Sequence, residues 1–282
     1  SILSTFAPDS GHQFFIESAM GHLDNPWQVP NVSIENGKAM AHTRIGWFRV
    51  VSNIPRAWAH QTFISELAAE QGKDELEYML ATIGEDREID VGAENFPDNY
   101  WDYGEHKGVY KFDTARLKNV LQMAADKSGY GGSLGEGEAI GLASHRSFLT
   151  YMGVAARVKI VDGQIRVPQM DIAVDAGFVA MPERVESQIQ GAAVMGMTAA
   201  MYSAITFEDG AAVEENYDTY QMVRSDNFPE KVNVHIVPHG FEVHAAGCGE
   251  PAVAPIAPAI GNAVFHATGK RFRHMPFGDS IA

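Results

Sequence analysis

The chain has 282 residues, 45% of them hydrophobic, and this length is enough for one large or two modest hydrophobic cores. Its formal net charge of −15 is spread along the sequence, which makes the phosphate backbone of a nucleic acid an unfavourable partner. The single cysteine, Cys248, excludes a disulfide within the chain and an iron–sulfur cluster held by cysteines of this chain alone.

Three patterns in the first half of the chain predict helices. Apolar residues recur at helical spacing over residues 57–71, and a shorter pattern of the same kind covers residues 73–83. Together these two segments resemble a helical hairpin. Asp113 or Thr114 can cap a third helix that runs through Lys127 and has its apolar side chains on one face.

Two other stretches of this half predict loops. Residues 95–110 are rich in aromatic and turn-forming residues, which indicates a surface excursion or a contact with another chain. Residues 129–137 are rich in glycine, but they lack the lysine of a phosphate-binding loop and follow a helix. We therefore interpret them as a flexible connector.

The second half of the chain begins with strands and predicts an α+β fold. Segments with strand character lie at 139–144, 151–161, 164–174 and 231–237. Asp162-Gly163 predicts a hairpin and hence an antiparallel sheet, and Asp209-Gly210 predicts a further hairpin. Helices are expected over 182–205, where small residues allow close approach, and over 255–268.

Glu250 stands in an unusual context. Glycines precede it, and prolines at 251, 255 and 258 follow it, so the acid lies between a glycine turn and a rigid helix start. A carboxylate held away from water in this way can have a raised pKa and act as a general base. The alternative is a glutamate that caps a helix N-terminus, and spacing alone favours that commoner arrangement.

Several segments in order carry a family resemblance. They are residues 46–53, running into 61–68, then 174–177 (Val-Asp-Ala-Gly), 188–197 (Gln-Ile-Gln-Gly-Ala-Ala-Val-Met-Gly-Met) and 249–269. The last three resemble motifs of the xanthine oxidase family of molybdenum hydroxylases. The first is similar to the branch typified by the beta subunit of isoquinoline 1-oxidoreductase, with its aldehyde dehydrogenase molybdopterin-binding subunits. The resemblance covers nearly the whole chain from about Trp27 onward.

The resemblance implies a molybdopterin cofactor, usually the cytosine dinucleotide form, whose own sulfurs hold molybdenum while the protein supplies no metal ligand. Glu250 matches the family's catalytic glutamate, which removes a proton from a metal-bound hydroxyl so that this oxygen attacks an electrophilic carbon. Gln188 matches the glutamine that hydrogen-bonds the pterin or the oxygens on the metal. Gly249 belongs to the same motif as Glu250 and is expected to contact the cofactor.

Arg49 matches an arginine that lies near the metal in this family. The glycines and phenylalanine usual after it are replaced here by Val50, Val51, Ser52 and Asn53, a departure that affects the local backbone contacts. Ser52 and Asn53 can donate hydrogen bonds to phosphate or pterin, and turn formation is an equal alternative for them.

Several other polar residues have a predicted role. His145, Ser147 and Phe148 lie where the isoquinoline-type branch has a similar segment, which implies that they approach the cofactor or the substrate. His235 and His239 flank a strand end, and we interpret them as structural residues rather than zinc ligands.

The resemblance also implies partners. Residues 1–282 correspond to the C-terminal part of a catalytic subunit, with a helical and connector region over about 1–137 and a cofactor-binding region over 138–282. The family's Gly-Gln-Gly and Phe-Gly-Gly loops are not in the sequence, so we expect the N-terminal half on a separate chain, with this one as a processed piece. Electrons are expected to leave through a small subunit with [2Fe–2S] clusters, and a cytochrome c is a candidate acceptor.

The implied reaction oxidises an aldehyde, which we favour, or hydroxylates an N-heteroaromatic carbon, with water as the oxygen donor. By analogy with this branch we expect a periplasmic enzyme, with the cytoplasm as the alternative. Two other functions stay open. Ser1 could be the N-terminal nucleophile of a hydrolase, or the chain could be a non-catalytic assembly subunit of the same fold.

Overall fold

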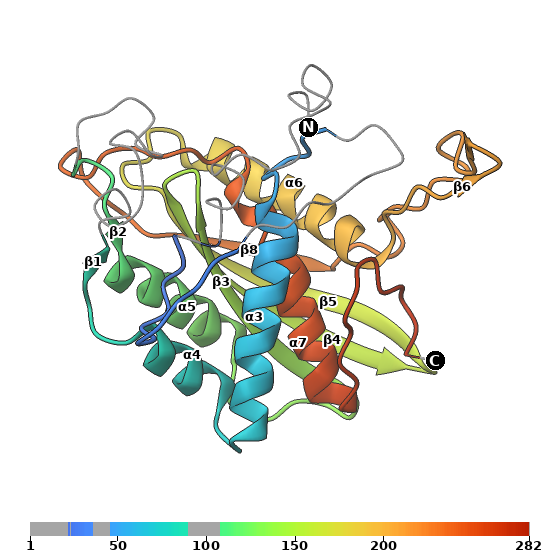
Figure 1. The fold of residues 1–282 in the computed structure, drawn as a ribbon, viewed down its shortest axis with the longest axis horizontal. Helices are drawn as coiled ribbons and strands as arrows, with labels where there is room; N and C mark the ends of the chain where they lie inside the picture. The colour runs from blue at the N-terminus through green and yellow to red at the C-terminus, as the bar shows by residue number, and fades with distance from the viewer. Residues whose placement is uncertain (1–21, 23, 36–45, 90–107, 282) are drawn as a thin grey trace.

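A four-stranded mixed sheet forms the centre of the structure (Figure 1). The computed structural model describes residues 22, 24–35, 46–89 and 108–281. In spatial order the strands are β3 (Glu138–Ser147), β4 (Thr150–Val161), β5 (Gln164–Asp175) and β8 (Lys231–Ile236). The first three are antiparallel, as predicted, whereas β8 lies parallel to β5. The sheet is mixed because the long connection between β5 and β8 returns the chain to the end at which β5 begins.

Both hairpin turns of this sheet use left-handed backbone. Asp162 and Gly163, between β4 and β5, have φ values of 51° and 76°, which match the twist of antiparallel strands. Phe148 and Leu149, between β3 and β4, have φ values of 50° and 67° although neither is a glycine. This conformation is unfavourable for bulky residues. A tertiary contact supports it, because the Phe148 carbonyl accepts a hydrogen bond of 3.1 Å from the Gly247 N–H.

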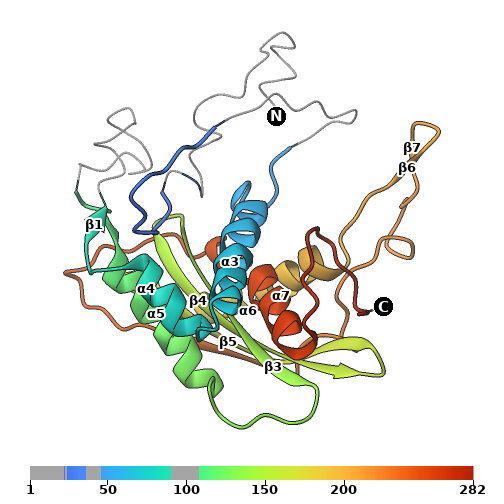
Figure 2. The ribbon, with the colours of Figure 1, turned by 60° about the horizontal axis from the view of Figure 1, so that its bottom comes forward.

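Helices cover both faces of the sheet. They are α3 (Asn53–Glu70), α4 (Glu75–Ile83), α5 (Thr114–Ser128), α6 (Pro182–Met201) and α7 (Ile256–Thr268). α5 packs on one face of β3, β4 and β5, and α7 packs on the opposite face (Figure 2). α3 and α6 contact α7, and α4 contacts α3 and α5. The result is a layered α+β fold.

Local signals explain where several helices begin and end. Asp113 caps α5 by accepting a hydrogen bond of 2.8 Å from the Ala115 N–H, and Gly129 ends this helix in the left-handed conformation. Asp74 caps α4 in the same way, so the helix predicted from residue 73 begins at Glu75. α3 begins four residues before the predicted 57, and α6 ends at 201 instead of 205.

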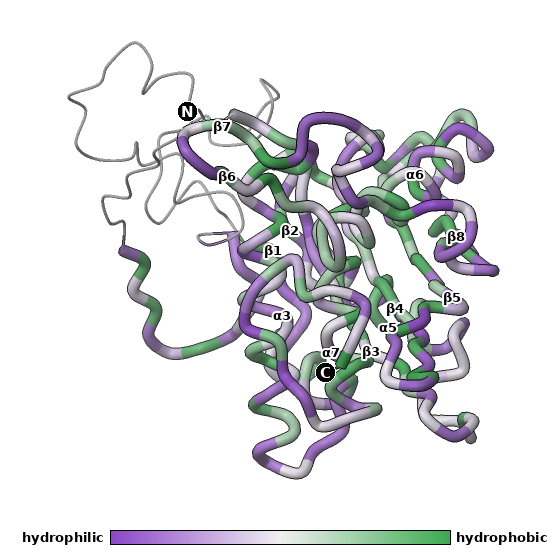
Figure 3. The backbone as a smooth tube through the Cα atoms, turned by 90° about the vertical axis from the view of Figure 1, so that its right-hand side faces the viewer, coloured by the Kyte–Doolittle hydropathy of each residue, from purple (hydrophilic) through white to green (hydrophobic). Residues whose placement is uncertain are grey.

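Alternation along the strands creates two hydrophobic clusters, one on each face of the sheet. On the α7 side lie Met152, Val154, Ala156 and Val158 of β4, together with side chains of α6 and α7. On the α5 side, Tyr151 and Ala155 of the same strand join residues of α4 and α5. The hydropathy trace in Figure 3 shows the hydrophobic central strands against more hydrophilic surrounding loops. Because both faces are covered, β4 is buried over most of its length.

The remaining regular elements are short. β1 (Glu88–Ile89) pairs with β2 (Phe112–Asp113), and β6 (Phe207–Glu208) pairs with β7 (Ala211–Ala212) around the predicted turn at 209–210. A 3₁₀ turn, η2 (Pro251–Val253), precedes α7. Within the described residues, no helix is both long enough and apolar enough to cross a bilayer. Ser1 and most of the predicted excursion at 95–110 lie outside the described residues.

Candidate active site at Glu250

The segment that carries Glu250 is fixed to one end of the sheet. The Ala246 N–H donates to the Ala176 carbonyl at 2.8 Å, just after β5. The Thr150 hydroxyl, at the start of β4, donates to the Gly247 carbonyl at 2.7 Å. The segment held by these two bonds leads to Glu250, which is half-buried and directly precedes η2. The proline-rich start predicted for the last helix contains η2, which ends three residues before α7 begins, and the Glu250 side chain makes no capping hydrogen bond there.

Four predicted site residues meet at this point: Arg49, Gln188, Gly249 and Glu250. The Arg49 side chain donates from Nε to the Gly249 carbonyl at 2.7 Å. Its Nη2 also donates to that carbonyl, and lies 3.3 Å from both the backbone oxygen and Oε1 of Gln188. The residues come from the segment before α3, from α6 and from the segment before η2. Segments far apart in the sequence thus form one cluster.

A backbone donor holds the Glu250 carboxylate. The Val50 N–H donates to Glu250 Oε2 at 2.5 Å. Val50 and Val51 both adopt left-handed backbone, with φ values of 66° and 52°. For β-branched residues this conformation is strained, typically by about 1–3 kcal/mol per residue. The family that the sequence resembles usually has glycines near these positions. The two valines of this chain adopt a backbone conformation that suits glycine.

Asn53 and Ser52 lie behind this turn. Asn53 is 2% exposed, and its Nδ2 donates to the Val50 carbonyl at 3.0 Å. Asn53 Oδ1 is 2.8 Å from His145 Nε2 on β3. The Ser52 hydroxyl oxygen is enclosed, with no hydrogen-bond partner among the described residues. The Asn53 side chain therefore supports the turn from inside, and direct contact of Ser52 or Asn53 with a cofactor stays a prediction.

Ser147 and Phe148 form the end of β3 and its turn. The Ser147 side chain is 6% exposed, and its hydroxyl is also enclosed without a partner in the described part of the chain. Phe148 is partly buried and packs against the α7-side cluster. Its carbonyl binds Gly247, three residues before Glu250. The turn thus contributes to positioning the Glu250 segment, and contact of Ser147 and Phe148 with the cofactor stays a prediction.

Burial shapes the electrostatics of the cluster. It lowers the pKa of the Arg49 guanidinium, and the charge of Glu250 acts in the opposite direction. Because the pKa of an arginine is so high, Arg49 stays cationic at neutral pH. Burial, followed by the charges of His60 and Arg146, lowers the pKa of His145 to about 3. His145 is therefore neutral at physiological pH.

The structure also shows how possible metal-binding side chains of the described residues are arranged. Over residues 22, 24–35, 46–89 and 108–281, no three His, Cys, Asp or Glu side chains are grouped to hold a metal ion. Burial raises the pKa of the Cys248 thiol, so its thiolate form is disfavoured. His235 and His239 bind different carboxylates, Asp171 at 2.9 Å and Asp175 at 2.8 Å.

The cluster also leaves room for a ligand. Gln188 and Gly249 are exposed, and a Cβ added to Gly249 would meet no atom within 4 Å. An arginine, an amide and a carboxylate beside open backbone provide hydrogen-bond donors and acceptors for a polar pterin. These residues fit a molybdopterin that brings its own metal ligands.

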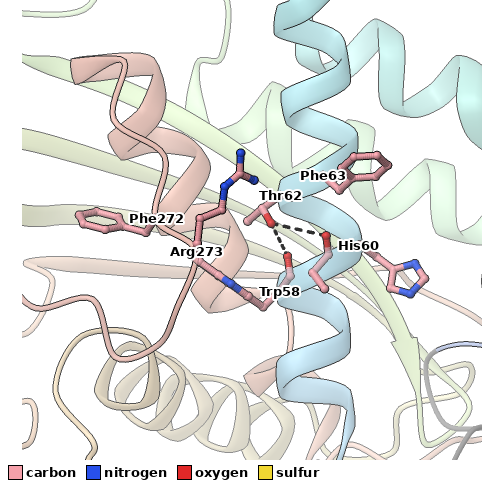
Figure 4. A pocket seen from close by; sticks show the side chains of 7 residues that line it. Trp58, His60, Thr62, Phe63, Phe272 and Arg273 are labelled. Atoms are coloured by element: carbon pink, nitrogen blue, oxygen red, sulfur yellow. Dashed lines mark hydrogen bonds between the residues drawn. The ribbon is translucent and has the colours of Figure 1, made fainter. Parts of the chain in front are cut away.

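A separate groove lies between α3 and the C-terminal segment (Figure 4). Its volume is about 470 Å³, and its lining includes Trp58, Phe63, Phe272 and Arg273. Within it the Thr62 hydroxyl donates to the Trp58 carbonyl at 2.7 Å. The groove shares no residue with the Glu250 cluster, and Arg273 is already paired with Glu66. We therefore place the candidate active site at Glu250.

Sequence reasoning missed one part of the site. The sequence does not predict that the Val50 N–H donates to Glu250, because a valine does not indicate left-handed backbone. The structure places one ring nitrogen of His145 2.8 Å from Asn53 Oδ1, and an approach of His145 to cofactor or substrate stays a prediction. In contrast, the small-residue face of α6 is used as expected, since a Cβ on Gly196 would clash with Ile256 of α7.

Several known proteins are similar to this chain. Residues 97–229 match the family model described as a molybdopterin cofactor-binding domain. A membrane-bound aldehyde dehydrogenase (pyrroloquinoline-quinone) of Gluconacetobacter polyoxogenes is 30% identical over 86% of this chain and 30% of its own length. A nicotinate dehydrogenase subunit from Pseudomonas putida is 29% identical over 89% of this chain and 20% of its own length. The chain thus spans less than a third of these curated relatives.

Two further similarities concern the branch and the fold. The beta subunit of isoquinoline 1-oxidoreductase from Brevundimonas diminuta is 26% identical over 60% of this chain and 21% of its own length. The aldehyde oxidoreductase structure from Desulfovibrio gigas superposes with a TM-score of 0.59 at 12% identity, over 87% of this chain and 41% of that one. That likeness shows the fold. Taken with the motifs, these similarities show a molybdopterin cofactor-binding domain, with relatives among the aldehyde, nicotinate and isoquinoline dehydrogenase subunits of the xanthine oxidase family.

Proposed function

We propose that this chain supplies the catalytic base and part of the cofactor site of a molybdenum-dependent oxidoreductase. The observation that carries the proposal is the convergence of Arg49, Gln188, Gly249 and Glu250 through hydrogen bonds between distant segments. The substrate is an aldehyde or an N-heteroaromatic compound, and water provides the oxygen. The names of the relatives, aldehyde dehydrogenase and nicotinate dehydrogenase, support these two substrate classes.

Each residue of the cluster has a distinct task. Glu250 takes up a proton on its carboxylate while its Oε2 stays bound to the Val50 N–H. Arg49 fixes Gly249 and Gln188 relative to each other and also binds Gln188 Oε1, so the amide nitrogen of Gln188 is the group that orients the pterin at the exposed face. When bound, the molybdenum cofactor supplies the two-electron redox chemistry. The protein then contributes orientation and control of protons.

The finer features of the enzyme rest on the resemblance. The cofactor is the cytosine dinucleotide form of molybdopterin. The N-terminal half of the subunit lies on another chain, and electrons leave through [2Fe–2S] clusters on a small subunit towards an acceptor such as a cytochrome c. The complex is periplasmic. The relatives named as subunits support assembly with other chains.

We favour aldehydes as substrates. The relative with 30% identity over 86% of this chain is named as an aldehyde dehydrogenase. Its name also gives pyrroloquinoline quinone, whereas the family model matched by residues 97–229 is described by molybdopterin. The cofactor must therefore be identified directly.

The test is cofactor and metal analysis of the natively purified complex, followed by turnover assays with aldehydes and N-heteroaromatics. We expect molybdenum and pterin in stoichiometric amounts, iron in a copurifying subunit, and aldehyde oxidation. Pyrroloquinoline quinone in the active complex without molybdenum would contradict the proposal. Hydrolase activity that is lost in Ser1→Ala would favour the N-terminal nucleophile, and an intact complex with no redox turnover would favour an assembly subunit.

A further inference from the structure

A chain of hydrogen bonds connects β3 to the candidate base. It runs from His145 Nε2 to Asn53 Oδ1 at 2.8 Å, and from Asn53 Nδ2 to the Val50 carbonyl at 3.0 Å. The Val50 N–H then reaches Glu250 Oε2 at 2.5 Å. Asn53 is the first residue of α3, and His145 lies within β3. The turn that holds Glu250 is thus tied to the central sheet.

The donors and acceptors along this chain determine the state of the imidazole. Asn53 donates through Nδ2 to a carbonyl, which places its Oδ1 towards His145. An amide oxygen only accepts hydrogen bonds, so His145 Nε2 must carry a proton. Because burial lowers the pKa of His145 to about 3, this is the neutral tautomer with the proton on Nε2. The donor to Asn53 is then present throughout the physiological pH range.

The turn needs such support. Val50 and Val51 have φ values of 66° and 52°, a conformation that costs β-branched residues about 1–3 kcal/mol each and persists only where its surroundings enforce it. Asn53 binds the carbonyl of Val50, whose own N–H holds Glu250. If Asn53 loses its orientation, the turn can relax and turn this N–H away from the carboxylate.

We propose that His145 is a positioning residue for Glu250, which acts by orienting Asn53 and so by holding the strained Val50–Val51 turn. This inference rests on the proposed function of Glu250 as the base. It gives His145 a role behind the turn, without contact with cofactor or substrate.

The experiment compares His145→Leu, which removes the donor, with His145→Gln, whose amide nitrogen can take the place of Nε2. The readouts on the holoenzyme are hydrogen exchange of the Val50 amide, kcat and KM, the pH profile of kcat, and molybdenum content. In His145→Leu we expect Val50 exchange to become about fivefold faster or more, as for a lost hydrogen bond of ordinary strength, with kcat falling by a similar factor. KM and molybdenum content should stay unchanged. His145→Gln should restore most of the protection of the Val50 amide from exchange and most of kcat.

Two controls separate positioning from a general loss of stability. His235→Leu removes a histidine that binds Asp171 and takes no part in this chain, so it should destabilise the protein without changing Val50 exchange. Asn53→Leu also removes the bond to the Val50 carbonyl, so its effect should be at least as large as that of His145→Leu. The double variant should be no worse than Asn53→Leu alone, because both residues act on one path. If His145→Leu is poorly folded, Asn53→Leu and His145→Gln carry the test.

The outcomes for the base and for its positioning are distinguishable. Unchanged Val50 exchange and unchanged kcat in both His145→Leu and Asn53→Leu would overturn the positioning role, even if Glu250→Gln is inactive. Full turnover in Glu250→Gln would overturn the proposed function itself, whatever the His145 variants do to the exchange of Val50.

Discussion

Val50 and Glu250 are 200 positions apart in the sequence, yet the N–H of Val50 donates to Oε2 of Glu250 at 2.5 Å. The carboxylate is therefore positioned by a backbone amide, which no side-chain substitution at position 50 removes except proline. One consequence is that the orientation of Glu250 depends on backbone conformation in the Val50–Val51 turn. Changes that alter this turn, or the segments bridged by Arg49, should affect catalysis before they affect the overall fold.

Arg49→Lys should lower turnover at least tenfold while leaving stability almost unchanged. Lysine keeps the positive charge, but it cannot replace the planar guanidinium that bonds Gly249 through two nitrogens and also reaches Gln188. Steady-state kinetics and thermal unfolding check this expectation. Arg273→Lys is the matched control, since Arg273 is exposed in its pair with Glu66 and surface pairs contribute about 0–1 kcal/mol. Equal activity of both variants would argue against a bridging role for Arg49.

Gly141→Ala should destabilise the protein by about 1–3 kcal/mol or more. A Cβ at this position of β3 would overlap with backbone atoms of Ala259 and Ala263 in α7, which cannot move independently of the helix. Gly191→Ala, in α6, is the control because an added Cβ meets no atom within 4 Å there, and alanine favours a helix by up to about 1 kcal/mol. Urea unfolding should show opposite shifts for the two variants, and a neutral Gly141→Ala would contradict the close contact of α7 with the sheet.

Asp175→Asn should destabilise the protein strongly at neutral pH, and less so in acid. Asp175 is 1% exposed and receives hydrogen bonds from Arg116 and His239. Burial acts to raise the pKa of Asp175, but the hydrogen bond and charge of Arg116 outweigh it and lower the pKa. The stabilisation is thus complete above the ordinary value near 3.9 and is lost as the pH falls through the lowered value.

Loss of such a buried partner typically costs about 3–5 kcal/mol at pH 7. Unfolding free energies of wild type and Asp175→Asn, measured from pH 7 down to 3, should therefore converge as the pH falls below about 4. Glu88→Gln is the control, because its ion pair with Lys111 is exposed at the surface. A difference between wild type and Asp175→Asn that stays constant with pH would contradict the assigned ion pair.

Much of the fold followed from the sequence because its signals were local. Asp113 caps a helix with its own side chain, and the turn at Asp162-Gly163 matches the twist of a hairpin. The parallel pairing of β8 with β5 could not be predicted in this way. Pairing across a long connection depends on how α6 packs against its neighbours, and no residue in β8 encodes its direction.

The candidate site was predictable only in its motif residues. Glu250, Gly249, Gln188 and Arg49 belong to segments with a recognisable pattern, and the structure brings them together. The contribution of Val50 was hidden, because a valine normally argues against left-handed backbone. Whether Ser52, Asn53, Ser147 and Phe148 contact a cofactor stays a prediction.

The most direct test of the account is turnover of Glu250→Gln in the purified complex, with molybdenum and pterin content measured on the same sample. Glutamine keeps an oxygen that can accept from the Val50 N–H, but it cannot take up a proton as a base. We expect unchanged cofactor content and thermal stability, with kcat reduced by about 10²–10⁴-fold. A fully loaded Glu250→Gln complex that turns over at the wild-type rate would contradict the assignment of Glu250 as the catalytic base.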